Sequence, residues 1–360
     1  MQWYTRQELL AARPPAAAGS ILFVGEPAEE AVGLGIQEWD QAEAIVRQSL
    51  KGCGLVSRDR VLIAMEQPAS PSTGLLARAA APLVQSVAIT GARGRMRLLA
   101  AIRSLKPTTL VITPCGIADF LARLYMEFNV DPVDLGLERI IIGGEVATGG
   151  LRTRLAREFE AEVAELYFDP FFGLPLAWRR GGAWEAPGGS VALAAVGKDE
   201  ILSEDLAAEA EEDAEIVVRP GFCAALRNGV LRTGTLRAGP KSDAGLFDRT
   251  YGDHVLLRGR WVSLKALRTQ LALIDGVSAW TLEIERGERT LDAATLKVGF
   301  NRETLVKNPM WLGRVEQAIA AACPVSMAIE TSLAGEIEGK PQGSVVDLRG
   351  QHRGPAGAAA

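Results

Sequence analysis

Short apolar runs alternate with amphipathic stretches along the first half of the chain. The apolar runs are rich in Val, Ile and Leu and are bounded by Gly, Pro or charged residues, a pattern typical of strands. It predicts strands at Ser20–Val24, Arg60–Ala64, Ser86–Thr90, Thr109–Thr113, Arg139–Ile142 and Ala164–Phe168. Apolar residues at helical spacing predict helices at Thr5–Ala12, Glu38–Leu50, Gly94–Leu105, Cys115–Phe128 and Gly150–Glu160. Alternating strands and helices predict a parallel sheet whose faces are covered by helices.

The pattern changes after Gly188, where strands follow one another without long helices between them. Strands are predicted at Val191–Val196, Glu215–Arg219 and Val230–Thr233, which together suggest an antiparallel appendage. The stretch Ala238–Gly245 is rich in Gly, Pro, Asp and Ser and is interpreted as a linker. We therefore predict two domains, residues 1–248 and 249–360.

The segment beyond the linker has the pattern of a small α+β unit. Its predicted strands and helices are Val255–Arg258, the helix Leu264–Ile274, Ala279–Glu285, Ala294–Phe300, the helix Pro309–Ala322 and Val325–Glu330. The tail Pro355–Ala360 is expected to be disordered. The predicted fold is a large α/β domain with a helix-covered sheet, followed by a small α+β domain.

Composition and charge exclude several classes of protein. Hydrophobic residues make up 48% and charged residues 23% of the 360 residues, as in globular proteins. The formal net charge is −5 and no basic block occurs, which argues against nucleic acid or an anionic membrane as a partner. No run approaches the roughly 20 apolar residues that span a bilayer, and the N-terminus lacks the pattern of a secretory signal. We expect a cytoplasmic protein.

The cysteines and histidines offer little catalytic chemistry. Cys53, Cys115, Cys223 and Cys323 are far apart in sequence and form no C-x-x-C pair, so neither a disulfide framework nor a structural zinc site is indicated. We interpret them as small buried apolar side chains. Two histidines cannot form a His-rich metal centre, and they make a Ser-His-Asp triad a poor hypothesis. No metal site is predicted, and catalysis must depend on other groups.

Six short segments carry a resemblance to a known family. In chain order they are Leu105–Cys115, similar to "KPT…TPSY", Ile141–Val146, similar to "GAEP", Ala164–Tyr167, in the place of "YGxTE", Leu231–Thr235, similar to "YRTxD", Gly252–Gly259, in the place of "DDMLIIRG", and Glu338–Arg349, similar to "EGKAxRVxDLR". The chain thereby resembles the adenylate-forming superfamily of acyl-CoA synthetases, adenylation domains and luciferases. The phenylacetate-CoA ligase branch is the most similar, and the resemblance covers about Ser20 to Arg349.

This resemblance implies a fold, a reaction and a set of site residues. It implies a large N-terminal domain, a hinge near Arg249–Asp253 and a small mobile C-terminal domain that acts as a lid. Such enzymes convert a carboxylate and ATP to acyl-AMP, which a thiol of CoA or a carrier protein then attacks. Lys340 would be the catalytic lysine that bridges the carboxylate and the α-phosphate. The residues assigned to nucleotide, acyl group, hinge and small domain are Gly143, Gly144, Glu145, Tyr167, Asp169, Thr235, Arg249 and Arg258.

The sequence departs from the family pattern where ATP would be held. The segment Phe23–Ala31 replaces the Ser/Thr/Gly-rich phosphate loop, and it has no hydroxyl donor but three carboxylates, those of Glu26, Glu29 and Glu30. These carboxylates would repel a polyphosphate. Phe171 stands where a Glu would bind Mg²⁺, and Asp169 is a candidate to replace it. Thr235 stands where the family has the Asp that binds both ribose hydroxyls, and it can make only part of that contact.

Several of these residues have a second, purely structural interpretation. Gly143 and Gly144 either shape a nucleotide pocket or end a buried strand in a tight turn. Lys340 is either the acyl-AMP lysine or a surface lysine in a turn. The aromatic side chains in the region of the predicted acyl site either line an acyl pocket or belong to the core. They are Tyr167, Phe168, Phe171, Phe172 and Trp178.

Two functional hypotheses are consistent with these residues. The first is a divergent acyl- or aryl-CoA ligase that activates a small, aromatic carboxylic acid through acyl-AMP toward a thioester, in a biosynthetic role, with weak or absent ATP turnover. Its ligands would be ATP or AMP and a CoA or carrier-protein thiol, with little dependence on Mg²⁺. The second is a non-catalytic protein of the same fold that binds an acid, an acyl thioester or a protein partner. Whether the chain forms a homodimer stays open.

Overall fold

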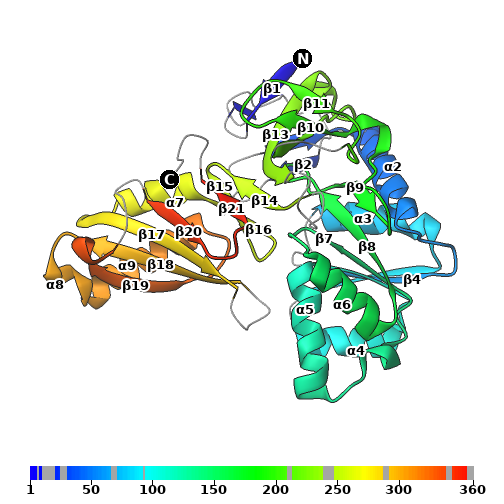
Figure 1. Cartoon of the computed structure of the whole chain (residues 1–360), viewed down its shortest axis with the longest axis horizontal. Helices are drawn as coiled ribbons and strands as arrows, with labels where there is room; N and C mark the ends of the chain where they lie inside the picture. Colours follow the sequence, from blue (N-terminus) through cyan, green and yellow to red (C-terminus); the bar gives the residue numbers. More distant parts are fainter. Residues whose placement is uncertain are drawn as a thin grey trace. The chain divides into compact units, whose positions relative to one another are not determined.

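The structure is a computed structural model of the whole chain, and it divides the chain into two compact units, Met1–Asp248 and Arg249–Ala360 (Figure 1). It describes residues 1–5, 8–9, 21–24, 31–65, 71–91, 94–208, 213–237, 247–286, 292–337 and 343–354. The predicted linker Ala238–Gly245, the tail Pro355–Ala360 and most of the predicted helix Thr5–Ala12 lie outside these residues. In the described ranges, no helix combines the length and apolarity needed to cross a bilayer.

A six-stranded sheet forms the centre of the first unit, with the strand order β5-β4-β6-β7-β8-β9. Its members are β4 (Arg60–Met65), β5 (Ser86–Gly91), β6 (Thr109–Ile112), β7 (Arg139–Gly143), β8 (Glu162–Phe168) and β9 (Pro175–Arg179). The first five run parallel, and β9 pairs with β8 in the antiparallel sense. The five predicted strands of this sheet are confirmed, and β9 was not predicted.

Helices cover both faces of this sheet, as Figure 1 shows. One face is covered by α2 (Ile36–Gly52) and α3 (Pro71–Ala80), and the other by α4 (Arg95–Leu105), α5 (Pro114–Arg123) and α6 (Gly149–Phe159). Within β4, Val61 and Ile63 belong to the first core, whereas Leu62 and Ala64 belong to the second. Because both faces are buried, these strands are continuous apolar runs and not alternating ones. The predicted α/β fold class is confirmed.

A second sheet in this unit is largely antiparallel. It contains β10 (Val191–Ala195), β11 (Ile201–Ser203), β12 (Ala214–Val218) and β13 (Gly229–Arg237). The strand β1 (Gln2–Tyr4), which was not predicted, pairs parallel with β13. The predicted antiparallel appendage is therefore confirmed.

One predicted strand was assigned to the wrong sheet. The strand β2 (Ile21–Val24) pairs antiparallel with β3 (Ala31–Leu34) in a two-stranded sheet, and not with the parallel strands. The chain returns on itself within a few residues here, which favours hairpin pairing over a long crossover. The segment between these two strands lies outside the described residues. It contains the three carboxylates that replace the phosphate-loop hydroxyls, those of Glu26, Glu29 and Glu30.

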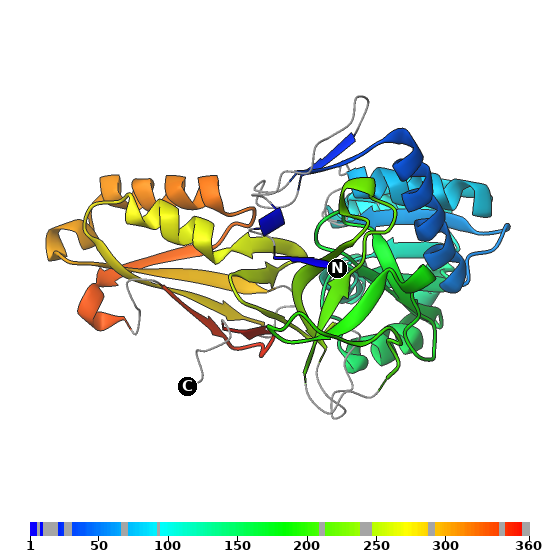
Figure 2. The same cartoon turned by 90° about the horizontal axis from the view of Figure 1, so that it is seen from above.

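The second unit contains a four-stranded sheet of order β19-β18-β17-β20. These strands are β17 (Val277–Glu285), β18 (Ala293–Phe300), β19 (Ala328–Leu333) and β20 (Ser344–Asp347). The helices α7 (Leu264–Ala272) and α9 (Pro309–Ala322) lie on one face of this sheet, in yellow and orange in Figure 2, and share its core. The short helix α8 (Glu303–Val306) precedes α9.

Two smaller pairs of strands complete this unit. The strand β15 (His254–Leu257) forms a hairpin with β16 (Arg260–Ser263), and β14 (Arg249–Tyr251) pairs parallel with β21 (His352–Arg353). The predicted helices Leu264–Ile274 and Pro309–Ala322 are confirmed, whereas β19 begins three residues later than the predicted strand Val325–Glu330. A mobile role for this unit stays a prediction.

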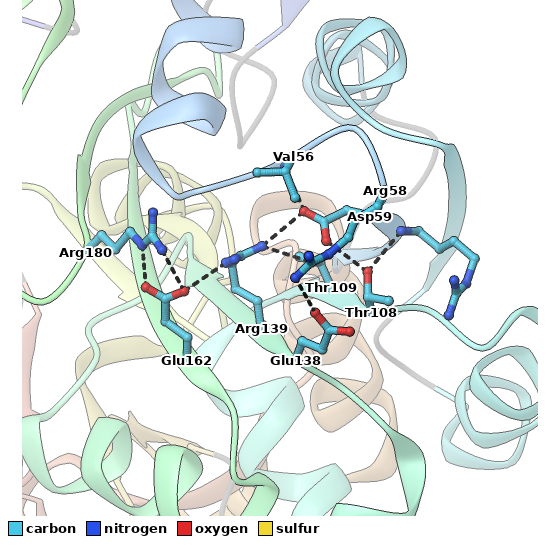
Figure 3. Close-up of polar contacts among 10 residues, drawn as sticks. Val56, Arg58, Asp59, Thr108, Thr109, Glu138, Arg139, Glu162 and Arg180 are labelled. Carbon is cyan, nitrogen blue, oxygen red and sulfur yellow. Dashed lines mark hydrogen bonds and ion pairs between the residues drawn. The ribbon is translucent and has the colours of Figure 1, made fainter.

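A buried ionic network connects the amino ends of the parallel strands in the first unit (Figure 3). Asp59, which precedes β4, is 1% exposed, and its carboxylate accepts hydrogen bonds from Arg139 Nη1 at 3.1 Å and Thr108 Oγ1 at 3.1 Å. Arg139 also donates from Nε to Glu162 Oε2 at 3.2 Å. Arg139 begins β7, Glu162 begins β8, and Thr108 directly precedes β6. The network therefore links the four neighbouring strands β4, β6, β7 and β8. The Arg180 guanidinium beside Glu162 holds the pKa of that carboxyl below its ordinary value.

We predict that Arg139→Met destabilises the protein by about 3 kcal/mol, because it removes a charged partner of the buried Asp59 carboxylate. Arg58→Met is the matched control, since the Arg58 side chain is 78% exposed and its pair with Glu138 spans 3.4 Å. Its cost should stay below about 1 kcal/mol. Guanidinium unfolding of both variants measures the difference, and equal losses would contradict a structural role for the network.

Candidate functional site

The carboxyl ends of β4, β6, β7 and β8 meet at one edge of the parallel sheet. The chain leaves β4 for β5 on one side and later enters β6 on the other side, so the strand order reverses between β4 and β6. Such a switch point is the usual ligand site of an open α/β sheet. The edge carries Met65, Thr113 and Gly143 at the ends of three adjacent strands, and it is the candidate site.

Two glycines follow each other at the end of β7. A Cβ on Gly143 would lie 2.6 Å from the carbonyl oxygen of Leu166 and 2.7 Å from Cε2 of Phe168, so only glycine fits there. Gly144 has φ +84°, a left-handed conformation that favours glycine. A Cβ on Gly144 would lie 3.5 Å from Met65 Cε and 3.9 Å from Thr113 Cγ2, across the switch point. The local structure therefore explains why glycine occupies both positions. Their role in binding a nucleotide stays a prediction.

Glu145 connects the loop after β7 to the start of α5. Its side chain is buried, and Oε2 accepts a hydrogen bond from the backbone N–H of Cys115 at 2.7 Å. Thr113 caps the same helix by accepting from the backbone N–H of Gly116 at 3.2 Å. A carboxylate is stabilised at a helix N-terminus by the unpaired N–H groups and the helix dipole. Glu145 thus fixes the Gly143–Gly144 turn against α5.

Tyr167 and Thr235, which the family resemblance assigns to one site, contact each other. Their hydroxyl oxygens lie 3.2 Å apart, although the residues are 68 positions apart in sequence. Tyr167 is 3% exposed and Thr235 is 1% exposed. Thr235 Oγ1 in turn lies 2.5 Å from Thr233 Oγ1, and the Thr233 hydroxyl donates to the carbonyl oxygen of Ile216 at 2.5 Å. The three hydroxyls form a buried chain from β8 to β13 and β12.

Each hydroxyl has one proton, and this determines which group donates in each hydrogen bond between the three hydroxyls. A threonine hydroxyl has one proton, and that of Thr233 is donated to Ile216. The Thr235 hydroxyl must therefore donate to Thr233, and the Tyr167 hydroxyl must donate to Thr235. A contact from Thr235 to a ribose would compete with this internal chain. In the structure, the Thr235 hydroxyl connects the hydroxyls of Tyr167 and Thr233.

Asp169, the candidate Mg²⁺ ligand, and Phe171, which stands where the family has a Mg²⁺-binding Glu, both lie in environments unlike that of a metal ligand. Asp169 is 1% exposed, and its Oδ1 accepts from the backbone N–H groups of Phe171 at 2.9 Å and Phe172 at 2.7 Å, while Oδ2 accepts from that of Leu174 at 2.8 Å. Phe171 is 3% exposed within the core. Among the described residues no group of three or more His, Cys, Asp or Glu side chains could hold a metal ion. Asp169 and Phe171 therefore do not fit Mg²⁺.

The aromatic cluster belongs mostly to the core. Phe172 contacts Phe222 edge-on with ring centroids 5.0 Å apart, and Trp178 is also buried. Tyr167 makes an edge contact with Phe247, with ring centroids 6.4 Å apart. Phe168 differs, because it is only half-buried and its ring lies against Gly143. For Phe171, Phe172 and Trp178, burial supports the core interpretation.

In the second unit, Arg258 occupies the turn of the β15–β16 hairpin. It has φ +52° and is followed by Gly259 at φ +73°, and its Nε donates to the carbonyl oxygen of Asp292 at 2.6 Å. Sequence reasoning missed the buried cluster beside it, in which the Arg349 guanidinium donates two hydrogen bonds to Asp347, each of 2.9 Å, and one to Asp292. The "DLR" spacing in the last family-like segment was the signal that could have found it. Arg249 begins β14, and Lys340 lies outside the described residues.

We predict that Thr235→Val lowers the free energy of unfolding by about 1 to 3 kcal/mol, because it removes a buried hydroxyl that is hydrogen-bonded to both Tyr167 and Thr233. Thr235→Ser keeps the hydroxyl and should cost about 1 kcal/mol or less. Urea unfolding of the two variants measures the difference. If the valine variant is as stable as the serine variant, the hydroxyl chain does not hold Tyr167.

Comparison with known proteins identifies the fold. No protein-family model and no curated protein sequence matches the chain. Among solved structures, 2-hydroxyisobutyryl-CoA ligase in complex with 2-HIB-AMP and CoA is 16% identical, and the match covers 96% of this chain and 80% of that chain with a TM-score of 0.76. Malonyl-CoA ligase with methylmalonyl-CoA and AMP is 15% identical, with 88% and 70% covered and a TM-score of 0.59. The amide bond synthetase McbA from Marinactinospora thermotolerans is 15% identical, with 87% and 65% covered and a TM-score of 0.62. The chain has the fold of the adenylate-forming enzymes.

Proposed function

We propose that the chain is a divergent acid-thiol ligase, which activates a small carboxylic acid as acyl-AMP on the way to a thioester. The observation that carries this proposal is the match of 96% of the chain to a CoA ligase whose structure contains an acyl-AMP and CoA. The candidate site lies at the carboxyl edge of the sheet, where such a fold binds ligands. The segments that resemble phenylacetate-CoA ligases support an aromatic acid as the substrate class.

Slow turnover of ATP is part of this proposal. The described residues offer no ligand set for Mg²⁺, since both oxygens of Asp169 accept backbone N–H groups and Phe171 is apolar. Thr235, in place of a ribose-binding carboxylate, donates its proton inside the protein. Each lost contact weakens the hold on the nucleotide, so acid activation should be slow. Lys340 is the proposed catalytic lysine of the acyl-AMP step.

A second candidate function is a non-catalytic protein that binds an acid or an acyl thioester. The specific observation in its favour is that three polar residues of the site, Glu145, Asp169 and Thr235, all use their side chains to hold the backbone or another side chain. Polar groups that bind the protein itself stabilise the fold without acting on a ligand. Loss of ATP chemistry with retention of the acid site would produce such a protein.

ATP–pyrophosphate exchange over a panel of aryl and fatty acids separates these two functions. We predict slow exchange with at least one small aromatic acid. The exchange rate should fall about 100-fold in the variant Lys340→Ala, because the variant lacks the positive charge that stabilises the negative charge developing in the reaction. Lys265→Ala is the control, since this exposed lysine of α7 belongs to the same unit. Formation of the acyl-CoA product, followed by mass spectrometry, identifies the thiol.

Two results would decide against the enzyme. Absence of exchange with every acid would leave the binding function, provided that a titration detects acid binding. Exchange that survives in Lys340→Ala at the level of Lys265→Ala would show that Lys340 is not the catalytic lysine.

A further inference from the structure

A groove in the second unit lies between the helix α9 and the strand β19, and its volume is about 510 Å³. One wall is a single side of α9, where Leu312, Glu316, Ile319 and Cys323 follow each other at intervals of three or four residues. The other wall is the segment 325–329, which enters β19. All of these residues belong to the second unit.

The strand β19 is the outer strand of its sheet and pairs with β18 alone among the described strands (Figure 1). Thr331 Oγ1 donates to the carbonyl oxygen of Val306 at 2.7 Å, so the end of α8 lies against the later part of β19. The earlier part, around Ile329, borders the groove. The outward backbone groups of an edge strand can pair with an added strand.

The two walls together have the geometry of a peptide-binding groove. Ile329 packs against the core that α9 shares, whereas the next residue, Glu330, is exposed. Since side chains of a strand alternate between its faces, a strand added beside β19 would direct every second side chain toward α9. From Leu312 to Cys323 the helix wall is about 16 Å long, the length of about five residues in an extended chain. The groove therefore matches one short extended segment.

The lining determines which side chains such a segment would carry. Leu312, Ile319 and Met327 offer apolar surface, which favours burial of apolar side chains. Among the described residues of the lining, Glu316 is the one that carries a charge, and it is exposed. A Lys or Arg side chain beside Glu316 would be attracted to its carboxylate, whereas an acidic one would be repelled.

We propose that this groove binds an extended peptide segment of a partner protein, which adds as a strand to the edge of β19. The segment has apolar side chains at alternate positions, with a Lys or Arg among them that faces Glu316. The binding site goes beyond the proposed function and does not rest on it, because the groove belongs to the second unit alone.

Calorimetric titration of the full chain with the capped peptide Ac-TLTKTLT-NH2 tests the proposal. Its leucines and lysine share one face, and its sequence reads the same in both directions, so either orientation of the added strand presents the same side chains. We expect a Kd below about 100 µM. Ac-TLTETLT-NH2 should bind about five to ten times more weakly, because its Glu meets Glu316. In Glu316→Gln the two peptides should bind within about twofold of each other.

A modified peptide tests backbone pairing, and variants of α9 test the location. N-methyl groups on the three central residues keep the side chains but remove N–H donors toward either edge, so binding should weaken at least about tenfold. Ala320→Trp, which fills the groove, should abolish binding. Ala321→Trp is the matched control, because this exposed neighbour on α9 lies outside the lining. Thermal melting checks that both variants are folded.

Cys323 provides a readout on the unmodified protein. It is half-buried in the lining of the groove, whereas the three other cysteines are buried. A saturating amount of Ac-TLTKTLT-NH2 should slow alkylation of the Cys323 thiol by iodoacetamide at least about threefold, because the bound peptide restricts access.

Several results would overturn the proposal. They are failure of Ac-TLTKTLT-NH2 to bind, equal affinity for the Lys and Glu peptides, equal affinity for the N-methylated peptide, unchanged binding by a folded Ala320→Trp variant, and unprotected Cys323 at saturation. Sedimentation of the unmodified chain as a dimer that Ala320→Trp converts to a monomer would show that a second copy occupies the groove instead.

Discussion

The buried pair of Arg139 and Asp59 is the constraint on which the candidate site depends. The pair lies at the amino ends of the parallel strands. Together with Thr108 and Glu162, it holds four neighbouring strands in one register. A slip of one residue would turn every side chain of a strand to the opposite face, and both faces here are buried under helices. Because the amino ends are held in register, the opposite ends of the same strands meet at a defined edge, where Gly143 lies.

At that edge, the polar side chains mostly satisfy other groups of the protein. Glu145 caps a helix, Asp169 holds a turn and Thr235 passes a hydrogen bond from Tyr167 to Thr233. Buried polar groups must find partners, and here the partners belong to the chain. The side chains of Glu145, Asp169 and Thr235 therefore help to fix the backbone and the neighbouring side chains at this edge.

Sequence patterns revealed the sheet better than they revealed the site. The strands β4 to β8 were predictable because burial on both faces produces apolar runs, whereas β2 was assigned to the wrong sheet because a short apolar run does not indicate its partner. Tyr167 and the glycines could be assigned to one site only through the family resemblance of the segments that contain them. The hydroxyl chain could not, because Tyr167 and Thr235 are 68 residues apart and neither sequence neighbourhood indicates the contact.

Taken together, these features lead us to propose that the fold retains a site for an activated acid but has lost contacts to the triphosphate. The sharpest test is a calorimetric comparison of Mg-ATP with benzoyl-sulfamoyl-adenosine, a stable analogue of an aryl-AMP in which a sulfamoyl group replaces the phosphate. We expect the analogue to bind at least about tenfold more tightly than Mg-ATP, because its acid half adds contacts that a triphosphate lacks. Binding of Mg-ATP that is as tight as that of the analogue would show that the triphosphate contacts have been kept.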